Sequence, residues 1–163
     1  MNTEPQLSTI TGHALVWLRA DLRVTDNTAL NRAIASGLPI IAVYIATPMQ
    51  WYQHYVSGRQ IDLIERRLQV VKQQFNDINI PLLILEGDDF SAATDIILNL
   101  CQQYQINAVY CNRQYGWNEK QRDRAVEQAL LAQDKLWYCS DDFCVLPPGM
   151  KAVYTWPLTL RAP

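Results

Sequence analysis

The sequence has few of the side chains on which metal sites and histidine-based catalysis depend. Only two histidines, His13 and His54, occur in 163 residues, and they lie far apart. No pair of cysteines has the C-x-x-C spacing of zinc or redox sites. We therefore expect no metal site and no catalytic residue in this chain. The four cysteines are Cys101, Cys111, Cys139 and Cys144.

An excess of basic residues is also absent. The chain has 14 Lys and Arg against 16 Asp and Glu, a formal charge of -2, and no basic run. Binding to duplex DNA depends on clustered Lys and Arg that neutralise phosphates. We expect no strong DNA binding by this chain alone.

Long apolar runs are missing as well. Residues 1–12 are polar and lack the apolar core of a signal peptide, and no run reaches membrane-spanning length. We expect no membrane association and a reducing, cytoplasmic setting, with the cysteines serving as small apolar residues.

What is present is an alternation of two kinds of apolar segment. Unbroken runs rich in branched residues predict buried parallel strands, and longer segments with helical spacing separate them. This order predicts an α/β fold: a Rossmann-like, doubly wound five-stranded parallel sheet with helices on both faces. The expected strands are 14–18, 40–45, 82–85, 108–111 and 136–139, and the expected helices are 27–36, 61–75, 90–104 and 119–132.

The remaining segments set the expected domain limits. We expect a flexible N-terminal segment over 1–13, one domain over 14–149, and the start of a proline-rich interdomain connector over 150–163. Within the domain, residues 46–58 are expected to be the longest irregular linker. In the last helix, Ala125, Ala129 and Leu130 are expected to face inward.

Ligands of open parallel sheets bind outside the carboxyl ends of the strands. The turn after the first strand, residues 19–23, contains no glycine, which argues against a G-x-G-x-x-G turn or a P-loop. In the same region Arg19 or Arg23 pairs with an anionic ligand or a partner domain, or the arginines pair locally with aspartates while Asp26 or Asn27 caps the first helix.

Residues 112–119 follow the fourth strand and carry the strongest site signal. Asn118 has capping-box spacing to Gln121, and Glu119 in the first turn complements the helix dipole, so both have a purely structural explanation. Alternatively, the Glu119 carboxylate accepts two parallel hydrogen bonds from an amino-pyrimidinone edge, as in pterins and guanine. Tyr115 and Trp117 would then form a flat apolar wall.

Other polar residues give weaker signals. His54 follows the second strand, and a lone loop histidine is usually solvated. The adjacent acids at 88–89 and 141–142 have the composition of a carboxylate-pair hydrolase, but such pairs are more often caps or turns.

Several segments, in order and at compatible spacing, resemble the photolyase/cryptochrome family. The match is strongest to bacterial cyclobutane pyrimidine dimer photolyases of the folate-using kind and covers essentially residues 14–149. It rests on residues 15–23, 26–27, 29–30, 43–48, 50–51, 80–83, 88–90, 115, 118–119, 122–123 and 145–149.

This resemblance implies an antenna domain that holds methenyltetrahydrofolate and passes light energy to a flavin. By position, Asn118 and Glu119 match the family's pterin contacts, and His54 matches a nearby loop histidine. The flavin (FAD) domain and its DNA-binding face are expected to lie beyond this chain, so the chain itself is not expected to repair DNA.

Two other functions remain open. The chain is alternatively a stand-alone pterin- or nucleotide-binding sensor, or a docking module for a separately encoded partner. The junction surface is the part of the domain where the flavin domain would sit. A broad apolar patch there would favour a partner over a stand-alone sensor, and self-association of the chain through this surface would support the same conclusion.

Overall fold

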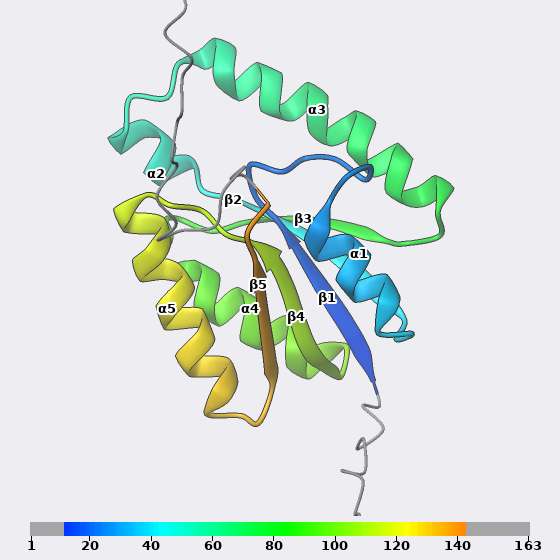
Figure 1. Ribbon diagram of the computed structural model, residues 1–163. Coiled ribbons are helices and arrows are strands. Elements are labelled where there is room, and N and C mark those ends of the chain that lie inside the picture. The colour runs from blue at the N-terminus through cyan, green and yellow to red at the C-terminus, as the bar shows by residue number, and fades with distance from the viewer. Residues whose placement is uncertain (1–11, 143–163) are drawn as a thin grey trace, which may run out of the picture.

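The computed structural model describes residues 12–142 and confirms the predicted α/β fold (Figure 1). Strands and helices alternate along the chain, with one additional helix after the second strand. In order, the elements are β1 (His13–Leu18), α1 (Thr28–Ala35), β2 (Ile40–Ala46), α2 (Pro48–Gln53), α3 (Gly58–Asp77), β3 (Leu82–Glu86), α4 (Ala92–Gln103), β4 (Ile106–Asn112), α5 (Trp117–Leu131) and β5 (Leu136–Ser140).

The five strands form one parallel sheet in the order β3-β2-β1-β4-β5. The chain moves outward from β1 to β3, then returns to β4 on the other side of β1. Val16 in β1 is therefore the register partner of both Ala42 in β2 and Tyr110 in β4. This reversal between β1 and β4 is the switch point where open sheets bind ligands.

Alternate side chains of the central strands pack into two separate hydrophobic cores, one on each face of the sheet. Val16 and Leu18 of β1 pack with α1 and α3 on one face, whereas Leu15 and Trp17 pack with α4 and α5 on the other. The two pairs of helices cover opposite faces of the sheet (Figure 1). Because side chains in a strand alternate with a period of two, one apolar run supplies both cores.

The prediction of an irregular linker over 46–58 was wrong in one respect, because this segment contains α2. Pro48 occupies the first turn of this helix, where its missing N–H costs nothing. The helix has only six residues and buries none of them, so it produces no apolar stripe in the sequence. Ser57 and Gln60 then form a reciprocal capping box that starts α3.

The start and the inward face of α5 also differ from expectation. Its N-cap is Gly116, so Asn118 lies inside the first turn instead of capping it. The buried face consists of Arg122, Val126 and Leu130, at spacing i, i+4 and i+8, whereas Ala125 is exposed. Leu130 thus faces inward as predicted, Ala129 is only partly buried, and Arg122 and Val126 form the rest of the buried face.

Several expectations fall outside the described residues. The connector over 150–163, residues 1–11 of the N-terminal segment and Cys144 cannot be compared with the structure, while β1 already begins at His13. Among the helices of residues 12–142, none has the length and apolarity required to cross a membrane.

Candidate functional site

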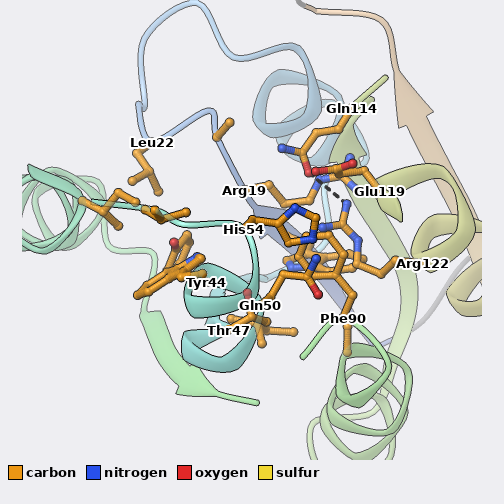
Figure 2. A pocket seen from close by; sticks show the side chains of 17 residues that line it. Arg19, Leu22, Tyr44, Thr47, Gln50, His54, Phe90, Gln114, Glu119 and Arg122 are labelled. Atoms are coloured by element: carbon orange, nitrogen blue, oxygen red, sulfur yellow. Dashed lines mark hydrogen bonds between the residues drawn. The ribbon is translucent and has the colours of Figure 1, made fainter. Parts of the chain in front are cut away.

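A cavity of about 470 Å³ opens at the carboxyl ends of β1 and β2, next to the switch point (Figure 2). Its walls come from the segments that follow β1, β2, β3 and β4. The apolar part includes Trp17, Tyr44 and Phe90, and the polar part includes His54 and Glu119. This is the location that the parallel-strand rule predicted.

Two buried arginines lie at the floor of the cavity and share one carboxylate. Arg19 Nη1 lies 2.6 Å from Asp123 Oδ1, and Arg122 Nη2 lies 2.7 Å from the same oxygen. The Arg122 guanidinium lies between the Trp17 and Phe90 rings, 4.8 Å from each centroid. Burial and the neighbouring Arg19 both lower the pKa of Arg122. Aromatic faces and a shared aspartate thus stabilise two like charges in close contact.

A network of buried amides holds the switch point together. Asn112, at the end of β4, donates to Asp21 Oδ2 at 2.7 Å and to Asn27 Oδ1 at 2.9 Å. Its own Oδ1 accepts from the Ala29 backbone at 3.0 Å. Asn27 also caps α1 by accepting from the Leu30 backbone, as one sequence interpretation predicted. The network joins β1, α1 and β4, so the cavity floor has a rigid frame.

The arginines after β1 form ion pairs far along the chain, and Arg23 also bonds locally, from Nε to the Asp26 carbonyl at 3.0 Å. Arg19 pairs with Asp123, and Arg23 pairs with Asp142. Asp141 accepts from Arg113 Nε at 2.8 Å and from the Tyr115 hydroxyl at 2.9 Å. Both aspartates of the 141–142 pair thus have structural partners, which does not favour the carboxylate-pair hydrolase.

In the other acidic pair, the Asp89 carboxylate also has a structural explanation. Asp89 accepts hydrogen bonds from the Ser91 backbone at 2.8 Å and from its hydroxyl at 2.6 Å. The hydrogen bonds to Ser91 hold the pKa of Asp89 below its usual value. Asp89 therefore shapes the turn before α4. Within residues 12–142, no three His, Cys, Asp or Glu side chains gather as metal ligands would.

Three of the four predicted site residues come together. Asn118 Nδ2 lies 3.4 Å from His54 Nε2, although the two residues are 64 positions apart. Glu119, next to Asn118, lines the cavity with His54. Tyr115 lies apart from them: its hydroxyl donates to Asp141, and the cavity lining does not include it. Trp117 is 75% exposed and does not line the cavity either.

The Glu119 side chain folds back over Gly116. A Cβ atom at position 116 would lie 2.0 Å from Glu119 Oε2, inside van der Waals contact. No residue of the described part donates a hydrogen bond to this carboxylate. Both oxygens of Glu119 therefore retain acceptor capacity at the cavity wall.

Some residues of the site gave no clear signal in the sequence. Tyr44 lines the cavity from β2, and burial raises its pKa to about 12. Arg122 was not predicted as part of the site, and Asn112 was named only as the first residue of the segment 112–119. For Arg122 a usable signal existed, because a charged residue occupies the first position of the i, i+4, i+8 face that continues through Val126 and Leu130.

Comparison with known proteins decides the family. The family model for DNA photolyase matches residues 14–152. The chain belongs to the DNA photolyase family. The deoxyribodipyrimidine photo-lyase of Vibrio cholerae is 46% identical over 135 residues, which are 83% of this chain and 29% of that protein. The Escherichia coli photo-lyase is 41% identical over 136 residues, with coverage of 83% and 28%.

Solved structures of photolyases and cryptochromes share the fold. A cryptochrome from Synechocystis superimposes with a TM-score of 0.72 at 24% identity, covering 80% of this chain and 27% of that one. An archaeal photolyase from Sulfolobus tokodaii, solved with two FAD molecules, gives a TM-score of 0.72 at 21% identity, with coverage of 83% and 30%. The chain thus spans less than a third of these photolyase-family proteins and corresponds to their N-terminal α/β domain.

Proposed function

We propose that this domain is the antenna domain of a light-driven deoxyribodipyrimidine photolyase, with methenyltetrahydrofolate held at the mouth of the cavity. The observation that carries the proposal is the Glu119 carboxylate. It lines the cavity beside the His54–Asn118 contact and accepts no hydrogen bond from the described residues. Such a carboxylate fits the paired N–H donors of a pterin ring.

Three of the four predicted residues have a distinct part in this proposal. Glu119 accepts from the amino-pyrimidinone edge, and Asn118 adds a polar contact. His54 orients the Asn118 amide through their 3.4 Å contact. Tyr115 has no part in this proposal, because its hydroxyl donates to Asp141 and its side chain does not line the cavity. When bound, the folate supplies light absorption, and the domain contributes binding and orientation.

A flavin-binding domain is the proposed partner. Tyr52 and Tyr55 are 82% and 94% exposed, and they flank His54 in sequence. Exposed Trp117 precedes Asn118 on α5. The His54–Asn118 contact brings these two segments together, so large exposed rings lie near the site. Unpaired aromatic surface of this kind is typical of interfaces, and it favours a partner over a stand-alone sensor.

The remaining activities belong to that partner in our proposal. FAD, DNA binding and light-driven repair would reside in the flavin domain, and the present domain would have no catalytic residue. We propose a cytoplasmic location, a reducing setting that suits the free thiols of Cys101, Cys111 and Cys139.

The proposal is tested by titrating the purified chain with methenyltetrahydrofolate and following near-UV absorption and fluorescence. We expect saturable binding that Glu119→Gln weakens by about 10- to 100-fold, because an amide cannot accept both hydrogen bonds. Glu127→Gln is the matched control, since Glu127 lies on the same helix but does not line the cavity. Equal weakening by both variants, or by neither, would remove Glu119 from the site.

A further inference from the structure

Two cysteines face each other on neighbouring strands, outside the proposed folate site. Cys111 on β4 is the register partner of Cys139 on β5, the edge strand of the sheet. Both side chains pack on the α4–α5 face. Both are free thiols, and each shifts the pKa of the other. Paired strands lie about 4.8 Å apart, a separation that falls within the Cα range of disulfides, roughly 4.4–6.8 Å.

The two thiols differ in accessibility and acidity. Cys111 is fully buried, and burial raises its pKa well above the usual value. Cys139 is only partly buried. The hydrogen bond from Cys111 holds the pKa of Cys139 below its usual value, and the positive charges of Arg19 and Arg113 act in the same direction. Cys139 is therefore the more exposed and the more acidic of the two thiols, and its register partner is a second thiol.

We propose that Cys139 and Cys111 form a redox-active dithiol, which a hydroperoxide oxidises reversibly to a disulfide between β4 and β5. The Cys139 thiolate attacks one peroxide oxygen, the O–O bond breaks, and the leaving hydroxide takes up a proton to become water. Cys139 is then a sulfenic acid. The Cys111 sulfur attacks the Cys139 sulfur, the S–O bond breaks, and a second water leaves with the Cys111 proton. Two thiols and one hydrogen peroxide thus yield one disulfide and two waters.

Cys101 provides an internal comparison. It lies buried on α4, and burial raises its pKa to about 11. It has neither a lowered pKa nor a thiol partner among the described residues. A peroxide dose that oxidises Cys139 should leave Cys101 reduced, because the thiolate is the reactive form.

The test is peptide mapping of the full chain after treatment with hydrogen peroxide. A Cys144→Ser background removes the cysteine that lies outside the described residues. Remaining thiols are blocked with N-ethylmaleimide before digestion and mass spectrometry. We expect a cross-linked peptide pair containing Cys111 and Cys139, lighter than the sum of the reduced peptides by two hydrogen atoms, and complete reversal by a phosphine reductant.

Variants separate this site from general oxidation. Cys101→Ser should give the same cross-link, whereas Cys111→Ser should abolish it and leave a Cys139 sulfenic acid that dimedone traps. If Cys111→Ser fails to fold, Cys139→Ser, at the partly exposed position, replaces it and should leave Cys111 reduced at the same dose. A cross-link to another cysteine or to a second chain overturns the proposal, as does persistence of both thiols while Cys101 oxidises. None of these outcomes depends on folate binding.

Discussion

The side chain of Asn118 contacts that of His54, with 3.4 Å between Asn118 Nδ2 and His54 Nε2. The contact joins the first turn of α5 to the C-terminal end of α2, beside Glu119 and the cavity. Two polar residues from separate segments thus meet beside the cavity, which His54 lines and Asn118 does not. We expect this contact to make the contributions of the two residues to the proposed folate binding interdependent.

The first prediction concerns this pair. We expect Asn118→Ala and His54→Ala each to weaken methenyltetrahydrofolate binding by about 3- to 10-fold, as the loss of one neutral hydrogen bond would. The double variant should weaken binding by less than the product of the two single effects, because each residue acts partly through the other. Fluorescence titration of the four proteins measures this coupling. Strictly multiplicative effects would show that the two residues act independently.

The second prediction concerns Gly116 as a positioning residue for Glu119. Its φ of -62° and ψ of 154° are open to alanine, so Gly116→Ala introduces no backbone strain. The new Cβ would instead displace the Glu119 carboxylate, because it would lie only 2.0 Å from Glu119 Oε2. We expect folate affinity to fall towards that of Glu119→Gln, while unfolding free energy falls by less than about 1 kcal/mol.

Gly58→Ala is the control for this substitution. Gly58 also stands at the start of a helix, and a Cβ there meets nothing within 4 Å. Titration and urea unfolding of both variants compare binding with stability. Unchanged folate affinity in Gly116→Ala would contradict the positioning role.

The third prediction is a dependence of stability on alkaline pH. Burial raises the pKa of Tyr44 to about 12, whereas an unfolded tyrosine has a pKa of about 10. Between these values the unfolded chain loses the proton and the folded chain keeps it, so unfolding becomes more favourable as pH rises. Ionisation of Tyr44 in the unfolded chain should therefore lower the unfolding free energy by up to about 3 kcal/mol between pH 10 and 12.

Tyr44→Phe should flatten this part of the stability profile. Urea unfolding at several pH values between 9 and about 12 compares the wild type with Tyr44→Phe and with Tyr52→Phe, a control at an exposed tyrosine. The same slope in all three proteins would show that Tyr44 ionises freely in the folded state.

The fourth prediction concerns the buried amide at the end of β4. Asn112→Ala removes two donated hydrogen bonds and one accepted bond, and it leaves Asp21 and the Ala29 N–H with unpaired capacity inside the protein. We expect a loss of about 3 kcal/mol or more in unfolding free energy. Asn99→Ala on the exposed side of α4 should cost far less. Similar urea midpoints for both variants would mean that the network contributes little.

The sequence by itself determined the class of fold and the edge of the sheet where the site lies. Unbroken apolar runs and helical spacing are local properties, and they reflect burial directly. These patterns predicted five parallel strands and helices on both faces of the sheet. With the rule for ligand sites in parallel sheets, they also predicted that the site lies in the segments that follow the strands. Glu119 and His54 were predicted as site residues from their position in those segments and from family resemblance.

Only the tertiary structure decided which side chains meet. The His54–Asn118 contact, the Cys111–Cys139 pair and the Asn112 network join residues from different elements. Their geometry depends on strand order and register, which a local apolar pattern does not encode. The inward face of α5 depended on a buried Arg122 whose charge is stabilised by Asp123 and two aromatic rings. Composition alone would have placed that arginine in solvent, because burial of a charge is favourable only once its partners are in place.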